Sequence, residues 1–172
     1  HGIGRRQRQM CIRDSLKKLW LSRMRTIQGL SKLTGLEYLH LSRIDAAPLG
    51  ALPASLKSLG YSGSYTGIKD TIPGLPRLEE LRLTLQEPRL MALSTLPPTL
   101  RSLTISDCEL RSLDAISGHA GLKSLRLRLH ADTDPAALLT LPALQKLHTR
   151  DPLPVSIREA LAARQVELTH DR

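Results

Sequence analysis

The sequence has 172 residues, of which 25 are Lys or Arg and 16 are Asp or Glu, giving a formal charge of +9 at pH 7. That length suits one domain and no more, and no run of 18 apolar residues is present to form a transmembrane helix. Two cysteines exclude a disulfide framework, and 36 leucines with no Phe predict an aliphatic core.

Residues 1–15 differ from the rest of the chain. They contain four arginines, no repeated pattern and no apolar stretch of the kind that a secretion signal needs. Residues 6–15 resemble a translated sequencing adapter, as found at the ends of metagenomic reading frames, so we expect a non-native or disordered leader. The alternative is a basic arm that binds nucleic acid or membrane. Without this segment, 21 basic and 15 acidic residues remain, a formal charge of +6.

From residue 16 the chain repeats the pattern Leu-x-x-Leu-x-Leu every 20 to 22 residues. The seven copies are Leu16-Leu19-Leu21, Leu36-Leu39-Leu41, Leu56-Leu59-Tyr61, Leu78-Leu81-Leu83, Leu100-Leu103-Ile105, Leu122-Leu125-Leu127 and Leu144-Leu147-Thr149. An eighth, degenerate copy is Ala163-Val166-Leu168. A fixed period of this length indicates a solenoid of stacked units.

Alternation within each copy predicts a short strand. Side chains two residues apart in an extended segment share a face, so the second and third core residues point inward and the residue between them points outward. Each copy adds one strand to a parallel sheet, and a single repeat cannot bury its apolar face alone. Between strands, residues 88–94, 133–139 and 156–163 predict short helices, the second with Asp134 as cap and Pro135 at its first position. Residues 60–74 are glycine-rich and predict an irregular return.

On these cores, the chain resembles a leucine-rich-repeat protein from residue 16 to about residue 170. The short repeats and the Leu-Pro pairs before several cores look most like bacterial leucine-rich repeats, including those of secreted effectors. The resemblance implies an α/β fold, a solenoid with a parallel β-sheet on its concave face and irregular, 3-10 or short helical returns on its convex face. It also implies a single domain over residues 16–172, with about seven repeats and a C-terminal capping unit from Val155 to Leu168.

One column departs from the family pattern. Leucine-rich repeats usually place Asn or Cys three residues after the last core leucine, where its side chain bonds to neighbouring loop backbone. This chain has no Asn, and the column reads Met24, Ile44, Ser64, Gln86, Cys108, His130 and Pro152. Because buried backbone groups still need partners, we expect water, Ser64, Gln86 and the loop geometry to supply them.

The outward residues of the strands form columns on the expected concave face, where this family usually binds. The column between the last two core residues reads Trp20, His40, Gly60, Arg82, Thr104, Arg126, His148 and Glu167. The column before the second core residue reads Lys18, Tyr38, Ser58, Glu80, Ser102, Ser124, Lys146 and Gln165. Trp, Tyr and Arg are enriched at binding hot spots. We therefore expect the partner-binding residues to be Trp20, Tyr38, His40, Arg82, Arg126, Arg128 and His148, with Arg128 just after its strand.

The alternative is that these columns are a solvent-exposed sheet face with no binding role, and that Trp20, in the first repeat, packs under a cap. The functional reading predicts a protein-interaction module that binds an acidic partner on its concave face. The other functions that we consider are binding of a polyanion, such as nucleic acid or an anionic glycan, and the scaffold of a larger bacterial effector or enzyme.

The sequence has no motif for catalysis. It lacks a Cys-x-x-Cys pair, a His-Glu-x-x-His motif, a phosphate-binding glycine loop and a Gly-x-Ser-x-Gly elbow, so we expect neither enzymatic activity nor a metal or cofactor. We expect a monomer. Cys108 is the single cysteine outside the leader, which favours a reducing compartment such as the cytoplasm, with secretion left open.

Overall fold

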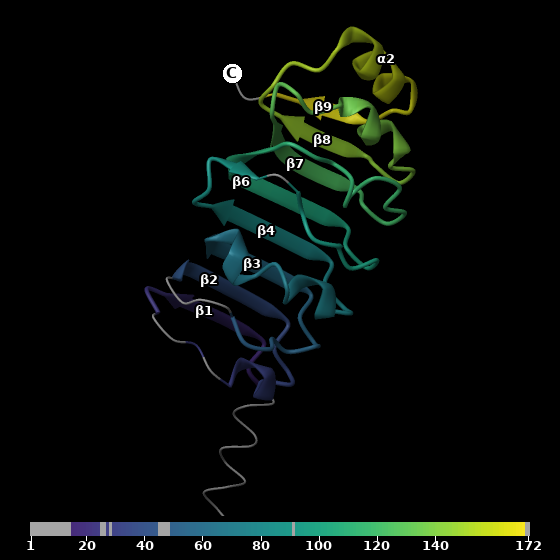
Figure 1. The fold of residues 1–172 in the computed structure, drawn as a ribbon. Helices are drawn as coiled ribbons and strands as arrows, with labels where there is room; N and C mark the ends of the chain where they lie inside the picture. Colours follow the sequence, from purple (N-terminus) through teal and green to yellow (C-terminus); the bar gives the residue numbers. More distant parts are fainter. Residues whose placement is uncertain (1–14, 25–26, 28, 45–48, 91, 171–172) are drawn as a thin grey trace, which may run out of the picture.

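The computed structural model describes residues 15–24, 27, 29–44, 49–90 and 92–170. Its strands are β1 (Lys18–Ser22), β2 (Tyr38–Ile44), β3 (Ser58–Gly63), β4 (Glu80–Leu85), β5 (Arg89–Leu90), β6 (Ser102–Leu110), β7 (Ser124–Leu129), β8 (Lys146–Thr149) and β9 (Glu167–Thr169). They form one parallel sheet in chain order from β1 to β9, with β5 off the main row and paired to β6 (Figure 1). The predicted solenoid with a parallel sheet is therefore confirmed.

Two side chains per repeat enter the core, as the alternation predicts. In the six repeats from Leu36 to Thr149, the second and third core residues are each 2% exposed or less. Burial of one such leucine contributes about 1.5 to 3 kcal/mol, so the stack is stabilised by many similar increments. The first repeat is looser, with Leu19 and Leu21 only partly buried, because β1 has a described strand neighbour on one side only.

The return segments carry short helices. These are η1 (Leu30–Lys32), η2 (Tyr65–Gly67), η3 (Ile72–Gly74) and η4 (Pro135–Thr140), all 3-10 helices, and the α-helix α2 (Val155–Ala163). Two predicted helices are confirmed by η4 and α2, and the Asp134 side chain caps η4 by accepting a hydrogen bond from the Ala136 N–H at 2.9 Å. None of the helices in the described ranges is both long and apolar enough to cross a bilayer.

The prediction of a helix at residues 88–94 is wrong. Arg89–Leu90 form β5, which pairs with the end of β6, and residues 92–94 lie outside any helix. The reason is that β6 is nine residues long and extends past its neighbour β4. The backbone groups at the end of β6 therefore pair with residues 89–90 instead. Glu109 N donates to Pro88 O at 3.0 Å. Residues 60–74 are also more regular than predicted, because they contain the end of β3 followed by η2 and η3.

The last repeat is shifted by two residues from its predicted alignment. Leu168 pairs with Leu147, the second core residue of the preceding repeat. Glu167, expected beside His148, therefore lies one column away from it. Gln165, expected in the strand, lies in the turn after α2 with a left-handed φ of 59°. The strand begins late because α2 continues to residue 163.

Side chains other than Asn bond to the loop backbone. Ser64 was expected to bond to loop backbone, but its hydroxyl donates to the side chain of Glu87 instead. Glu87 Oε1 in turn accepts from the backbone N–H of Tyr65 at 2.9 Å. Gln86 was expected to help but is exposed, and its neighbour Glu87 takes that place. In the last repeats, Asp151 Oδ2 accepts from the backbone N–H of Leu129 at 2.9 Å.

The predicted leader, residues 1–15, lies outside the described residues except for Ser15. Its non-native or disordered character therefore stays a prediction. The assignment of residues 16–172 to a single domain stays a prediction as well.

Candidate functional site

The central outward column lies in register across seven strands. Its members, each paired with the next, are Trp20, His40, Gly60, Arg82, Thr104, Arg126 and His148. The eighth position holds Thr169 rather than the expected Glu167. The members from His40 to His148 each lie between two buried core residues, so they face the side of the sheet opposite the core. Trp20 lies between the partly buried Leu19 and Leu21 and faces the same side.

Aromatic side chains mark the first end of this face. Trp20 on β1 is 66% exposed and Tyr38 on β2 is 41% exposed, so Trp20 is not packed away in the described part of the chain. The Lys18 ammonium lies 5.0 Å from the centroid of the Tyr38 ring, within cation–π range. Exposed apolar rings next to a cation form a surface suited to contact with another protein.

His40 covers Gly60 on the neighbouring strand. A β-carbon built on Gly60 would collide with the imidazole ring of His40, and Gly60 is accordingly buried. Glycine is therefore required if the ring is to keep this position. The imidazole ring of His40 therefore extends from β2 over β3, toward the middle of the face.

Arg82 is held by a carboxylate on its own strand. Its Nη2 lies 2.5 Å from Glu80 Oε1, and Glu80 Oε2 accepts from Ser58 Oγ at 2.9 Å. The Arg82 side chain remains 65% exposed. The middle of the face therefore presents a guanidinium whose charge is already largely matched.

Arg126 and His148 bond to one another across β7 and β8. Arg126 Nη2 lies 3.1 Å from His148 Nε2, and His148 Nδ1 lies 2.8 Å from Thr169 Oγ1. A guanidinium can only donate, so His148 Nε2 is the acceptor in this contact. The chain of contacts orients both predicted residues at the second end of the face.

Arg128 lies inside β7 rather than after it. It faces Glu109, with Arg128 Nη2 at 3.1 Å from Glu109 Oε1. The spacing of the repeats would instead have placed Arg128 beside Ser106. A register shift between β6 and β7 causes the difference, since the pair Thr104 and Arg126 is followed directly by the pair Glu109 and Arg128.

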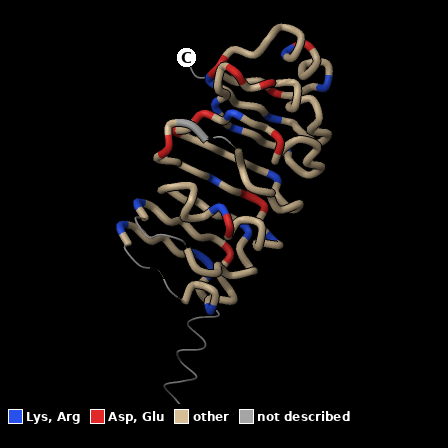
Figure 2. Tube along the Cα trace, viewed as in Figure 1, with Lys and Arg blue, Asp and Glu red and all other residues tan. Residues whose placement is uncertain are grey.

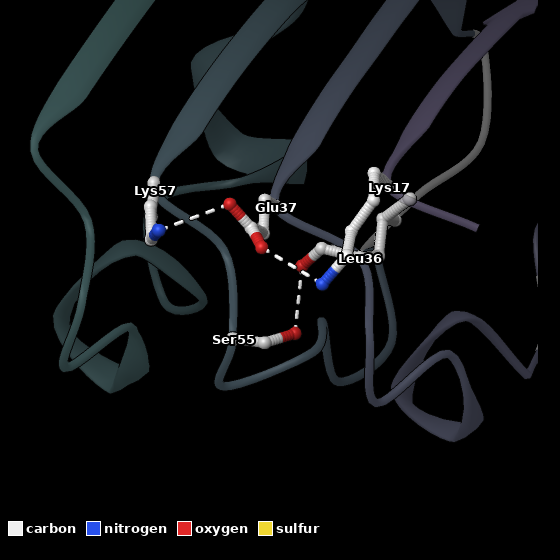
Figure 3. Close-up of polar contacts among 5 residues, drawn as sticks. All are labelled: Lys17, Leu36, Glu37, Ser55 and Lys57. Carbon is white, nitrogen blue, oxygen red and sulfur yellow. Dashed lines mark hydrogen bonds and ion pairs between the residues drawn. The ribbon is translucent and has the colours of Figure 1, made fainter. Parts of the chain in front are cut away.

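A row of alternating charges at the start of the strands was missed by the sequence reasoning. Glu37 accepts hydrogen bonds from the ammonium groups of Lys17 and Lys57, each at 2.9 Å (Figure 3). The bond from Lys17, and next the bond from Lys57, lower the pKa of the Glu37 carboxyl from 4.5 to about 2. The pKa of Lys57 is raised by the same bond. The signal was available, because each residue directly follows the first leucine of its repeat.

Charge on the molecule is mixed rather than segregated. Figure 2 shows Lys and Arg interleaved with Asp and Glu along the whole stack. On the strands, Arg82, Arg128 and Lys146 each have a carboxylate within 3.1 Å. The net positive charge of the chain therefore does not translate into an unbroken basic stripe.

The next question is whether side chains that could bind a metal ion or react with a substrate gather near this face. Within the described ranges, no group of three or more His, Cys, Asp or Glu residues is arranged to hold a metal ion. Cys108 is fully buried. The arrangement supports recognition by contact, with aromatic rings at one end and arginines at the other.

Comparison with known proteins identifies the fold. No protein family matches the chain, and no curated protein matches its sequence. Among solved structures, an internalin from Listeria monocytogenes superposes with a TM-score of 0.60 at 19% sequence identity. The superposition covers 94% of this chain and 48% of the internalin chain, so the chain spans about half the length of that structure. The protein thus has the leucine-rich-repeat fold, as the sequence resemblance implied.

Proposed function

We propose that this chain is a protein-interaction module whose concave sheet face binds an acidic partner. The observation that carries the proposal is the in-register column from Trp20 to His148, which presents aromatic, imidazole and guanidinium groups on one continuous surface. These residue types are the ones enriched at binding hot spots. The leucine-rich-repeat fold supports a binding role rather than catalysis.

A partner with both apolar and acidic groups suits the two ends of the face. Trp20 and Tyr38 offer exposed ring area at β1 and β2. Arg126 and Arg150 offer guanidinium groups at β7 and after β8. The described strands lie parallel and roughly 5 Å apart, so one extended segment or one folded edge could contact both ends. We propose that the module acts as a monomer.

Interleaved carboxylates make a polyanion the weaker candidate. Glu80, Glu109 and Glu167 lie among the arginines and lysines of the face and would repel a run of phosphates. A nucleic acid would also find few aromatic rings on which to stack bases. Binding to a polyanion would lose affinity steeply with added salt, whereas a protein partner held partly by Trp20 and Tyr38 would retain part of it.

The test is a pull-down from nuclease-treated bacterial lysate with the full chain. Two double variants probe the two ends, Trp20→Ala with Tyr38→Ala and Arg126→Glu with Arg150→Glu. A matched control, Arg77→Glu with Arg158→Glu, makes the same charge change at exposed positions outside the sheet. We expect one captured protein to be lost with either concave-face variant and kept with the control. Capture that is equal for all four proteins, or that appears only without nuclease, would contradict the proposal.

A further inference from the structure

A small cavity opens where β7 and β8 end, beside the bulged part of β6. Its volume is about 180 Å3. It is lined by Ile105, Ser106, Asp107, Arg126, Leu127, Arg128, His148 and Arg150. Drug-sized ligands occupy about 300 Å3 or more, so this cavity suits a single small chemical group.

The backbone of β6 creates the cavity. The pairs Thr104 with Arg126 and Glu109 with Arg128 are consecutive in the ladder, so residues 105–108 of β6 lie opposite Leu127 alone. Asp107 takes a left-handed φ of 61° within this bulge. Bulges of this kind bend a strand and re-aim its side chains. Here residues 106 and 107 line the cavity, although Ser106 still pairs with Thr84 of β4.

The cavity lining carries an excess of positive charge. Three guanidinium groups line it against the single carboxylate of Asp107. Arg128 is also paired with Glu109, yet its Nε is buried and has no hydrogen-bond acceptor among the described residues. Arg150 is exposed and has no hydrogen bond or ion pair within the described part of the chain. N–H groups of Arg128 and Arg150 therefore remain available to donate hydrogen bonds to a ligand.

We propose that this cavity binds one oxyanion group, a carboxylate or a phosphoryl group, presented by the partner. The proposal rests on the proposed function, since it names the chemical group that the concave face recognises. Guanidinium groups bind both kinds of oxyanion through parallel N–H donors, which a lysine cannot reproduce. The Arg126–His148–Thr169 chain of contacts holds one guanidinium in place before the ligand arrives. The volume of about 180 Å3 limits the occupant to a small head group.

The experiment is an NMR titration of the full 172-residue chain at constant ionic strength, with inorganic phosphate and, in a second series, with acetate. The guanidinium Nε–Hε signals report on each arginine. We expect saturable shifts at Arg126, Arg128 and Arg150, with Arg77 and Arg158 unaffected. Saturation by phosphate alone would indicate a phosphoryl group, and saturation by both probes would indicate that a carboxylate suffices.

Variants make the test specific. Arg150→Gln removes a side chain that has no described partner, so the fold is expected to persist, and phosphate affinity should fall about tenfold or more. Arg126→Gln should have a similar effect, and Arg77→Gln should have none. Shifts that spread over all arginines without saturation, or undiminished binding by Arg150→Gln, would overturn the proposal.

The NMR titration and the pull-down together distinguish the oxyanion site from the proposed protein-binding function. Saturable phosphate binding, together with protein capture that ignores the concave-face variants, would leave the cavity as an anion site and remove the proposed function. Protein capture that depends on Trp20 and Tyr38, with no phosphate or acetate binding, would support the proposed function and overturn the oxyanion site.

Discussion

The imidazole ring of His40 occupies the space where a β-carbon at Gly60 would stand. The two residues are direct partners across β2 and β3. The absence of a side chain at residue 60 is thus part of how the face is built, because it lets one ring reach over the next strand. The contact predicts an energetic coupling between the two positions.

A double-mutant cycle measures that coupling. In a His40→Ala background, Gly60→Ala should stabilise the protein by about 0.4 to 1 kcal/mol, because it restricts the unfolded chain and the ring that a β-carbon would meet first is gone. In the wild-type background the same change should lose that gain, since the ring must leave its rotamer at a cost of about 0.5 to 1.5 kcal/mol. Urea unfolding gives both values. Gly74→Ala is the control, because a β-carbon at that position would meet no atom within 4 Å and its effect should be additive with His40→Ala. Additivity at residue 60 would contradict the contact.

The Lys17–Glu37–Lys57 ladder predicts a specific loss of stability in acid. The folded pKa of Glu37, about 2, lies below its ordinary value of 4.5. The unfolded chain therefore binds more protons between these pH values, and the stabilisation from Glu37 is fully present above pH 4.5 and lost as the pH falls through 2. The difference in unfolding free energy between wild type and Glu37→Gln should shrink over this interval. A difference that stays constant with pH would count against the ladder.

An independent readout of the ladder is the titration midpoint of the Glu37 carboxyl by NMR. Replacing both lysines, as Lys17→Met with Lys57→Met, should raise that pKa from about 2 toward 4.5, because both hydrogen bonds are removed. Glu159→Gln on the exposed face of α2 changes the same charge away from the ladder and serves as the control for the stability curves.

Asp151 is predicted to stabilise the fold from the position just before the column in which leucine-rich repeats usually carry Asn. Its Oδ2 accepts from the N–H of Leu129, a buried residue. Asp151→Ala should lower the free energy of unfolding by about 1 to 3 kcal/mol, because a buried donor is left without an acceptor. Asp151→Asn keeps a side-chain oxygen at the same distance and should retain most of the stability in urea unfolding. Equal losses in the two variants would show that the oxygen is not what matters.

The C-terminal unit is predicted to act as a cap. Deleting residues 153–172 removes α2 and β9, together with the buried side chains of Leu153, Ile157 and Leu161. The exposed core and the unpaired edge of β8 should then cause aggregation, detectable by size-exclusion chromatography with light scattering. Arg164→Met, which removes only the hydrogen bonds to the carbonyls of Leu139 and Leu141, should remain soluble and lose about 1 kcal/mol. A soluble, cooperatively unfolding deletion would contradict the role.

The fold was predictable because each strand follows from its own repeat. Leu39 and Leu41 must both be buried, which places His40 on the outer face whatever the return segments do. Parallel stacking then puts His40 beside the equivalent residue of the next repeat without further information. The column of predicted site residues was therefore placed correctly from Trp20 to His148, although their role in binding stays a prediction.

Features that depend on departures from the repeat could not be predicted in the same way. The contact of Arg128 with Glu109 depends on a bulge in β6 and on the left-handed backbone of Asp107, neither of which the leucine spacing encodes. The contact of His148 with Thr169 depends on where the last strand begins, and the end of α2 sets that position. The Lys17–Glu37–Lys57 ladder differs from both, because it repeats with the leucines and could have been found by reading that column.

In-register stacking has a consequence for how a partner would change the molecule. Each strand pairs mainly with its immediate neighbours, so a stack of this kind can fray repeat by repeat from either end. Six strand steps place Trp20 and His148 about 30 Å apart. A partner in contact with both would span the strands from β1 to β8, and would therefore favour molecules in which every intervening repeat is folded. Binding of such a partner would suppress local unfolding of individual repeats, so the whole stack of repeats would resist proteolysis.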